Sequence, residues 1–463
     1  MNSGPFAESS PAMDPLSSPL LTDLYELTML KAYFESGMTD TAVFELFVRK
    51  LPPERNFLLF AGLEQVLRFV ERLRFGEAEL GWVERSGLFG PAFVRRLESF
   101  RFTGDIHAMA EGTAFFPDEP VLRVTAPMPE AQLLETRVLN LIHFETVVAS
   151  KAVRSVLAGG GKKLIDFGLR RAHGAEAGLL AARASYLAGF DGTSTVLADA
   201  AFGIPAFGTM AHSFVQAHDS EADSFHDFAR AFPRNAVLLI DTYDTVDAAR
   251  KVVRLAERLR TEGIAVRGVR LDSGDLDDLS RQVRRILDDG GLTDAIIFAS
   301  GNLDEYRVAQ LVGAGAPIDS FGIGTSLVTS SDAPSLDAVY KLQEYAGKPR
   351  RKRSAGKATW PGRKQVYRLS KDDGVFLRDI VAPATEICEG EPLLQPVMKG
   401  GNRLASPSLD AARAHVRSQL ARLPVQYRKL ERAEPAYPVE IAASLKALAE
   451  EIDRATATDT SIA

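Results

Sequence analysis

An arginine, two aspartates, a serine and a glycine lie together in residues 270–276 (RLDSGDL), directly after a strand-like run. Aspartate and serine commonly cap the helix that follows such a turn, and one cap would account for a single acid. It would not account for a second acid and an adjacent arginine. Asp272 and Asp275 could hold ribose hydroxyls or a Mg²⁺ shared with a pyrophosphate, and Arg270 could bind a carboxylate or phosphate. We therefore favour a binding site at this turn.

A second candidate site follows the strand-like run at the start of residues 163–174. Phe167 stands beside a glycine there, and Arg170 and Arg171 come shortly after it. An aromatic residue taken alone is more often part of a core, and paired arginines are usually a solvated surface. At a strand end, the ring could instead stack on an aromatic anion while a guanidinium binds its charge. The segment alone leaves both interpretations open.

Two shorter motifs could complete such a site. His212 follows a turn of small residues in 208–214 (GTMAHSF), although a lone histidine is most often a structural residue. Residues 321–326 (FGIGTS) form a glycine-containing turn after a strand, where exposed backbone N–H groups could hold a phosphate. Many tight turns have this composition, so the motif is weak by itself.

The elements that must position these residues alternate between strand and helix. Residues 275–289 and 245–262 place apolar residues on one helical face, and Gly290 and Gly263 stand at their ends. Such an alternation implies parallel strands, because parallel pairing needs a crossover. The strand-like runs are 163–168, 189–196, 204–210, 236–243, 264–271, 295–302 and 318–324.

An open doubly wound sheet and a closed β/α barrel would both produce this alternation. The polar residues distinguish them, since almost every run carries its polar residues at its C-terminal end. A barrel brings all these ends to one face, whereas an open sheet uses mainly those at its switch point. We therefore predict an α/β protein with an irregular, TIM-like β/α barrel over residues 151–345.

An additional α+β domain is predicted from both ends of the chain. Residues 41–49 and 105–124 suggest strands around a helical stretch at 63–75, and residues 364–381 suggest a hairpin across KDDG. The predicted organisation is listed in chain order: a tail at 1–20, an α+β domain at 21–150, the barrel at 151–345, a C-terminal segment at 346–455 whose strands at 364–381 return to the N-terminal domain, and a tail at 456–463.

The composition is that of a folded globular protein. The 463 residues are 46% hydrophobic and 25% charged, and the net charge of −6 argues against a nucleic-acid or anionic-membrane surface. The basic stretch at 348–368 is interpreted as a solvated loop. We expect a cytoplasmic location, because Cys388 is a single cysteine and no signal peptide or membrane-spanning stretch is evident.

Six motifs, in this order, resemble the nicotinate phosphoribosyltransferase family: TDLYELTM, FGLRRAHG, GFDGTSTVLA, GTMAHS, VRLDSGDL and FGIGTSL. The resemblance runs from residue 21 to at least residue 368. It implies a type II phosphoribosyltransferase that joins nicotinate to 5-phosphoribosyl 1-pyrophosphate in NAD salvage, coupled to ATP hydrolysis. It also implies Mg²⁺ and a head-to-tail homodimer with shared active sites.

The resemblance also implies a role for each matching residue. His212 would be phosphorylated by ATP, and Phe167 would stack on the pyridine ring opposite Tyr25 of the partner subunit. Asp272 would anchor the ribose. The other substrate-binding positions would be Arg170, Ser194, Thr209, Arg270, Gly301, Gly324 and Thr325, of which the arginines meet anionic groups and the last three meet phosphate.

Ser194 bears on the choice of substrate. Related nicotinamide enzymes have an aspartate at this place, which would repel nicotinate, whereas a serine can donate to its carboxylate. Nicotinamide and quinolinate phosphoribosyltransferases stay as alternatives, as does a sugar-phosphate lyase or isomerase on a similar barrel. A Schiff-base enzyme is disfavoured, because Lys162 and Lys163 stand at the start of their strand. A metabolite-binding protein would not need both His212 and the turn at Asp272.

Overall fold

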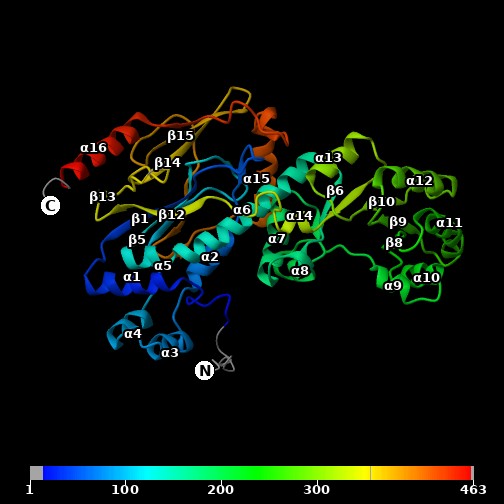
Figure 1. The fold of residues 1–463 in the computed structure, drawn as a ribbon, viewed down its shortest axis with the longest axis horizontal. Helices are drawn as coiled ribbons and strands as arrows, with labels where there is room; N and C mark the ends of the chain where they lie inside the picture. Colours follow the sequence, from blue (N-terminus) through cyan, green and yellow to red (C-terminus); the bar gives the residue numbers. More distant parts are fainter. Residues whose placement is uncertain (1–13, 355, 460–463) are drawn as a thin grey trace. The chain divides into compact units, whose positions relative to one another are not determined.

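The computed structural model describes residues 14–354 and 356–459, which divide into two compact units (Figure 1). The first unit contains residues up to 146, residues 335–427 and residues from 433 onward. The second unit contains residues 147–334 and 428–432. The second unit therefore ends before strand β12 (Ala338–Tyr345), which our sequence-based boundary at residue 345 had placed in the barrel.

The second unit is built on one parallel sheet whose strand order is β7-β6-β11-β10-β9-β8. The first and last strands in sequence, β6 and β11, are neighbours, and the other neighbours are consecutive in the chain. This order is that of a barrel, which confirms the predicted fold class. The strands are β6 (Lys163–Asp166), β7 (Gly192–Thr193), β8 (Ala236–Leu239), β9 (Val266–Leu271), β10 (Ile296–Ala299) and β11 (Ser320–Ile323).

The barrel is irregular between β7 and β8. The predicted strand at 204–210 makes one parallel bridge, from Ala206 to Thr193, and no named strand. The amide of Thr193 donates to the carbonyl of Pro205 and the amide of Phe207 donates to Thr193. No strand pairing joins this segment to β8 among the residues that the structure describes, so the sheet curls without closing.

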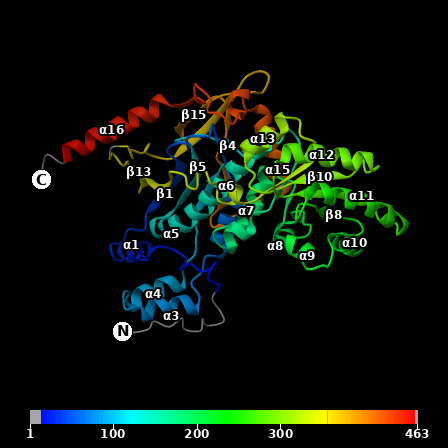
Figure 2. The ribbon, with the colours of Figure 1, turned by 45° about the vertical axis from the view of Figure 1, so that its right-hand side comes forward.

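Helices follow the strands as the sequence predicted. In α12, Leu276, Val283 and Leu287 are buried, and α12 packs against α11 (Figure 2). The N-cap of α12 is Asp275, whose carboxylate accepts the amide N–H of Asp277 at 3.1 Å. The helices of this unit are η1 (Leu169–Arg171), α7 (Ala175–Ala188), α8 (Val196–Phe202), α9 (His212–Gln216), α10 (Glu221–Ala231), α11 (Thr245–Thr261), α12 (Leu276–Asp289), α13 (Glu305–Gly313) and α14 (Thr325–Val328).

The first unit contains a sheet of order β13-β12-β1-β5-β3-β17-β18. Its predicted strands are present, but β12 and β17 join them from the C-terminal half of the chain. The strands are β1 (Thr41–Val48), β3 (Asp105–Ala108), β5 (Pro120–Pro127), β12 (Ala338–Tyr345), β13 (Lys348–Pro349), β17 (Gln395–Lys399) and β18 (Asn402–Arg403), and β2 (Leu58–Leu59) pairs with β4 (Ala114–Phe115).

The predicted hairpin across KDDG is present as β14 (Lys364–Ser370) and β15 (Phe376–Pro383). It belongs to the first unit but forms a separate sheet of order β16-β14-β15-β19, with β16 (Glu391–Pro392) and β19 (Val439–Ile441). The hairpin thus returns to the N-terminal unit, as predicted, while β12 and β17 are the strands that extend the N-terminal sheet.

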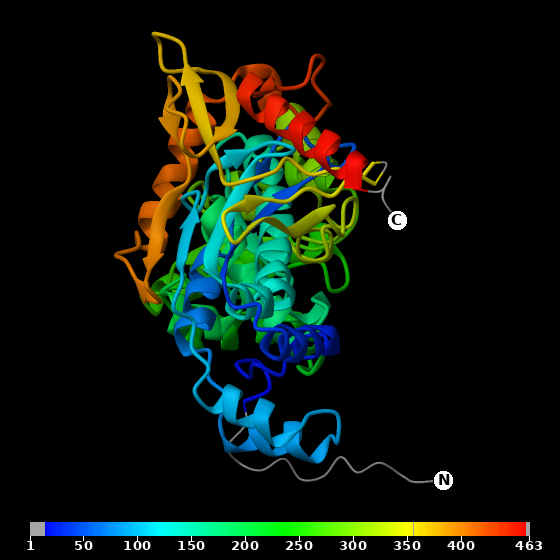
Figure 3. The same ribbon diagram turned by 90° about the vertical axis from the view of Figure 1, so that its left-hand side faces the viewer.

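Helices of the first unit surround these sheets. Helices α3 and α4 pack against each other as a pair away from the sheets (Figure 3). The helices are α1 (Leu24–Glu35), α2 (Leu63–Arg72), α3 (Glu77–Arg85), α4 (Pro91–Glu98), α5 (Met128–Leu133), α15 (Leu409–Arg422), η2 (Val425–Arg428) and α16 (Ala443–Asp459), and α6 (Glu135–Ala158) begins in the first unit and ends in the second.

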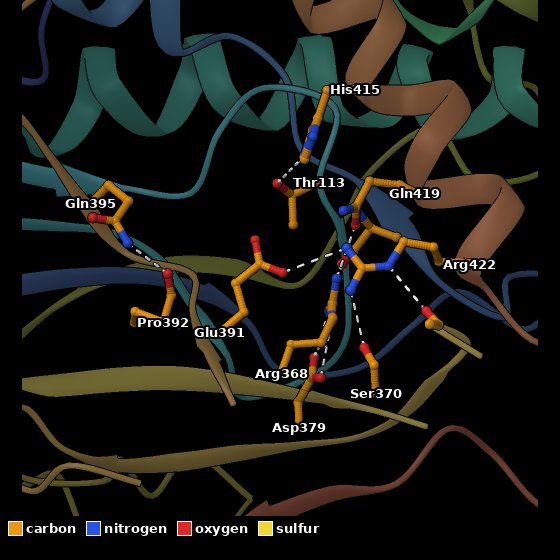
Figure 4. Close-up of polar contacts among 12 residues, drawn as sticks. Thr113, Arg368, Ser370, Asp379, Glu391, Pro392, Gln395, His415, Gln419 and Arg422 are labelled. Atoms are coloured by element: carbon orange, nitrogen blue, oxygen red, sulfur yellow. Dashed lines mark hydrogen bonds and ion pairs between the residues drawn. The ribbon is translucent and has the colours of Figure 1, made fainter. Parts of the chain in front are cut away.

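A buried charged network connects the hairpin to its surroundings. The guanidinium of Arg368 pairs with the carboxylate of Asp379, and both side chains are fully buried (Figure 4). Tyr437 donates to Asp379 at 3.0 Å. Burial and then the nearby Asp379 carboxylate raise the pKa of Glu119 well above its usual range. We infer that Glu119 is protonated at neutral pH and that Asp379 carries the charge that balances Arg368.

Replacing Glu119 with glutamine is expected to raise the free energy of unfolding at pH 7 by up to about 3–4 kcal/mol, because the unfolded glutamate is ionised and must take up a proton on folding, whereas glutamine is neutral in both states. Asp379→Asn should lower the free energy of unfolding by about 3–5 kcal/mol, since Arg368 would lose its buried partner.

The raised pKa of Glu119 also makes stability depend on pH. Its contribution to the free energy of unfolding is fully present below the pKa of an unfolded glutamate and is lost as pH rises through the pKa of the folded state. Thermal melts from pH 5 to 9 should therefore show Glu119→Gln gaining on wild type as pH increases. A gain toward low pH would contradict this assignment.

Candidate active site

The C-terminal ends of the barrel strands surround two adjoining cavities of 390 and 430 Å³. Phe167, Arg170, Arg270 and Asp272 line both cavities. Except for Asp275, every site residue predicted in the barrel lines at least one of them. Ser194, Thr209 and His212 line the first cavity, and Gly301, Gly324 and Thr325 line the second. Residues from five strand ends thus meet at one face, as the barrel interpretation requires.

Arg270 and Asp272 form the centre of the site. The Nη2 of Arg270 donates to Oδ1 of Asp272 at 2.8 Å, and its Nε donates to the hydroxyl of Ser300 at 2.9 Å. Burial alone would raise the pKa of Asp272, but the hydrogen bond from Ser300 and the charge of Arg270 outweigh it and hold this pKa below its usual value. Asp272 is therefore a carboxylate at neutral pH, with Oδ2 directed toward the first cavity's histidine.

His212 is the first residue of α9, and 41% of its side chain is exposed. Its Nδ1 lies 3.1 Å from the hydroxyl of Thr242 and its Nε2 lies 3.7 Å from Oδ2 of Asp272. Nδ1 is therefore within hydrogen-bond distance of Thr242, and Nε2 faces Asp272, which lines both cavities. An imidazole held in this way can act as a nucleophile toward a group bound between them.

Phe167 lines both cavities. Its ring is half-buried and packs against Phe298 with centroids 5.4 Å apart, and the guanidinium carbon of Arg270 lies 5.3 Å from its centroid. A Cβ on Gly322 would come within 2.8 Å of the Phe167 ring. Glycine at position 322 therefore makes room for an aromatic ring that could stack on a flat ligand.

Asp166 connects β6 to the loop that carries Ser194. Its carboxylate accepts the amide of Gly168 at 2.8 Å and the hydroxyl of Thr193 at 2.7 Å, and its carbonyl accepts the amide of Ser194 at 2.8 Å. Burial raises the pKa of Asp166 to about 6. These contacts fix the backbone of Ser194 at the wall of the first cavity, so Asp166 is a positioning residue.

Gly301 brings the second cavity's loop against the turn at Asp272. Its φ is +92°, and a Cβ there would lie 1.8 Å from the carbonyl oxygen of Asp272. The site therefore depends on a glycine both for backbone conformation and for space.

We expect Gly301→Ala to lower the free energy of unfolding by about 2–5 kcal/mol, combining a left-handed alanine with a steric overlap. Gly315→Ala is the matched control, because Gly315 also has a positive φ of +66° but nothing lies within 4 Å of its added Cβ. The control should cost only about 1 kcal/mol. Thermal melts of both variants measure the difference. Equal destabilisation would show that the contact with Asp272 does not limit this position.

The structure changes the interpretation of two acids. Asp275, which we paired with Asp272 as a ligand, caps α12 and is 69% exposed. Asp241, which lies two residues after the end of β8 and was not among the predicted site residues, accepts the amide of Asp272 at 3.1 Å through Oδ2. Its Oδ1 is buried and has no hydrogen-bond partner among the described residues. The sequence could have identified Asp241 as a site residue, because it lies near the C-terminal end of a strand-like run, as the predicted site residues of the barrel do.

The acids of the site fit a magnesium ion only in part. No cluster of three or more His, Cys, Asp or Glu that could hold a metal ion occurs in the described part of the chain. Mg²⁺ commonly uses one or two carboxylates together with substrate phosphates and water. Asp241, with an unpartnered oxygen, and Asp272 match this smaller requirement, so the site fits a metal that arrives with a phosphorylated substrate.

One predicted site residue lies elsewhere. Tyr25 lies on α1 in the first unit, and 44% of its surface is exposed. Burial raises the pKa of its hydroxyl to about 12, even though a hydrogen bond with Thr136 lowers it. The residue is therefore an uncharged aromatic ring on the surface of its unit.

Family models match three parts of the chain. They are described as the nicotinate phosphoribosyltransferase N-terminal domain for residues 20–143, the nicotinate phosphoribosyltransferase family for residues 162–354, and the nicotinate phosphoribosyltransferase C-terminal domain for residues 384–449. No described helix is long and apolar enough to cross a membrane.

Individual relatives carry the same name. A nicotinate phosphoribosyltransferase of Mycobacterium tuberculosis is 51% identical over 91% of this chain and 91% of its own length. The Bacillus subtilis nicotinate phosphoribosyltransferase is 40% identical over 76% of this chain and 73% of its own. The crystal structure of human nicotinic acid phosphoribosyltransferase superposes with a TM-score of 0.84 at 31% identity, covering 93% of this chain and 99% of that one.

Proposed function

Because this chain belongs to the nicotinate phosphoribosyltransferase family, we propose that it is an enzyme that joins nicotinate to 5-phosphoribosyl 1-pyrophosphate. The products are nicotinate mononucleotide and pyrophosphate, in NAD salvage. The observation that carries the proposal is the pair of cavities that share Phe167, Arg270 and Asp272. One cavity suits a flat aromatic base and the other, lined by three glycines and Thr325, suits phosphates.

The reaction needs electrostatic stabilisation more than proton transfer. The pyridine nitrogen is already a nucleophile; it forms the new bond to C1 of the ribose while the bond to pyrophosphate breaks. Asp272 is ionised beside the shared wall, where it can hold the ribose and stabilise positive charge that develops on the sugar. Arg170 and Arg270 supply positive charge for the carboxylate or the phosphates.

ATP coupling is assigned to His212. Its Nε2 would attack the γ-phosphorus of ATP, ADP would leave, and later hydrolysis of the phosphohistidine would return the free imidazole. The exposed position of His212 at the first cavity supports this role. Mg²⁺, held by Asp241 and Asp272, would neutralise phosphate charge when it is bound.

Product formation from labelled nicotinate tests the proposed function directly. Purified protein with labelled nicotinate and 5-phosphoribosyl 1-pyrophosphate should form nicotinate mononucleotide, and ATP should increase the rate. Nicotinamide and quinolinate are the competing bases. Preference for either one, or turnover of a sugar phosphate without any base, would replace the proposal with the corresponding alternative.

We further propose that the enzyme is a homodimer with active sites shared between subunits, in which Tyr25 of the partner subunit completes the base site. Tyr25→Ala and Asp272→Ala should each be inactive alone. Mixed under conditions that exchange subunits, they should regain up to about a quarter of wild-type activity, because half of the dimers are mixed and each has one intact site. The measurement is activity against mixing ratio. Heterodimers that form without activity would indicate sites built within one chain.

A further inference from the structure

A third cavity, of 500 Å³, lies in the first unit and is not used by the proposed reaction. It is lined by α2, by the end of β3 and the loop after it, by residues 391–397, by residues 405–407 and by α15. This volume lies in the range of sites that bind small molecules. The five segments come from both halves of the chain, and all of them belong to the first unit.

One end of this cavity carries an amide that is held in place. Gln419 is 2% exposed, and its Oε1 accepts the guanidinium of Arg368 at 3.0 Å and the amide of Ala114 at 3.3 Å. Both contacts fix the orientation of the amide group. Gln419 lines the cavity, and the hydrogen bonds found for its side chain all use Oε1, so Nε2 is available there as a donor. A donor at a cavity wall favours a ligand with an acceptor.

His415 stands one helical turn before Gln419 on α15. One of its ring nitrogens, Nε2, lies 3.1 Å from the hydroxyl of Thr113. Burial lowers the pKa of His415, so the ring is neutral at neutral pH. Figure 4 shows His415 beside Thr113, the carboxylate of Glu391 directed toward Arg422, and the amide of Gln395 directed toward the carbonyl of Pro392. Thr113, Glu391, Gln395, His415 and Gln419 all line the cavity.

The rest of the cavity is apolar or acidic. Leu63, Leu67, Leu393, Val397 and Ala412 provide apolar surface. Glu64, Glu111 and Glu391 line it as well, and no Lys or Arg does so among the described residues. Glu64 is paired with Arg403, and Glu391 lies 3.5 Å from the guanidinium of Arg422. The walls that the structure describes therefore offer no cation to pair with an anionic ligand, and their apolar surface can accommodate a flat apolar body.

We propose that this cavity is a binding site for a neutral, mainly apolar molecule that carries a carboxamide. The carbonyl oxygen accepts a hydrogen bond from Nε2 of Gln419. The NH₂ group of the ligand donates to the carboxylates that line the cavity, and the apolar body of the ligand lies against α2 and residues 393–397. The proposal does not depend on the reaction assigned to the barrel.

The probe is 2-naphthamide, and 2-naphthoate, which has the same shape with a negative charge, is the matched ligand control. Calorimetry on the full-length protein should give one site for the amide with a Kd on the order of 0.1 mM. Binding of the naphthoate should be at least about tenfold weaker. Nicotinate and 5-phosphoribosyl 1-pyrophosphate at saturation should leave amide binding unchanged, since they occupy the barrel cavities.

Variants on α15 locate the site. Ala411 and Ala414 are both exposed, but only Ala411 lines the cavity. Ala411→Phe should weaken binding of the amide at least about tenfold, whereas Ala414→Phe should leave it unchanged. The proposal is overturned if the amide does not bind, if the naphthoate binds equally well, if substrates displace the amide, or if the two variants behave alike. Gln419 itself is not substituted, because it also pairs with Arg368.

Discussion

His212→Ala is expected to reduce nicotinate-dependent ATP hydrolysis by roughly three orders of magnitude or more, because it removes the proposed phosphoryl acceptor. Acid-labile labelling from γ-labelled ATP should disappear in the same variant. Slow product formation without ATP should survive, since Phe167, Arg270 and Asp272 remain to bind the base and the sugar. Labelling and ATP hydrolysis, measured beside ATP-independent product formation, separate the loss of coupling from the loss of transfer.

The chain supplies a matched control for this variant. His218 lies six positions after His212 and does not line either barrel cavity; its Nδ1 lies 2.7 Å from the carbonyl of Phe214. His218→Ala should therefore retain phosphorylation and coupling, while testing for general damage to the segment that contains α9 and the residues just after it. If His212→Ala were labelled as strongly as wild type, the phosphoryl group would reside elsewhere.

Thr242 fixes which ring nitrogen of His212 faces the site. Its hydroxyl lies 3.1 Å from Nδ1 of His212 and leaves Nε2 facing Asp272 at 3.7 Å. The sequence could not show this arrangement, because Thr242 follows β8 and stands thirty positions from His212. In the described part of the chain, the segment before His212 does not pair with β8, so only the curl of the sheet brings the two residues together.

Much of the barrel could be predicted because its signals are local. Apolar runs followed by amphipathic helices occur within about 30 residues, and a parallel sheet follows from them. The exception at 204–210 has a local cause, since Pro205 has no N–H to donate to a neighbouring strand. Gly208 adds flexibility after it. The segment therefore keeps one bridge with Thr193 and then turns toward the first cavity.

The positions that were interpreted wrongly depend on contacts that spacing does not define. Asp272 and Asp275 are three residues apart, but Gly274 between them has a φ of +81° and turns the chain. One acid therefore faces the cavities and the other caps α12. Similarly, β12 follows the barrel in sequence, yet it pairs with β1 in the first unit. Neither the turn at Gly274 nor the pairing of β12 with β1 can be predicted from a local sequence pattern.

Replacing Ser194 with aspartate should lower kcat/KM for nicotinate by roughly ten- to a thousandfold and shift preference toward nicotinamide. Ser194 is half-buried at the wall of the first cavity, and its backbone is tied to Asp166. A hydroxyl there can donate to the carboxylate of nicotinate, whereas an aspartate would place two negative charges close together. At 4 Å and an effective dielectric of 20, this repulsion is about 4 kcal/mol, or nearly three decades in kcat/KM.

Arg170 and Arg270, which line the same cavity, should reduce this repulsion, and the lower end of the range reflects their presence. Ser194→Asn is the matched control, because asparagine has the size of aspartate without its charge. Asparagine should affect the two bases to a similar extent, while aspartate should penalise nicotinate selectively. The measurement is kcat/KM for both bases on the three proteins, with thermal melts to establish folding. A folded Ser194→Asp enzyme with the wild-type ratio of the two bases would mean that Ser194 does not meet the carboxylate of nicotinate.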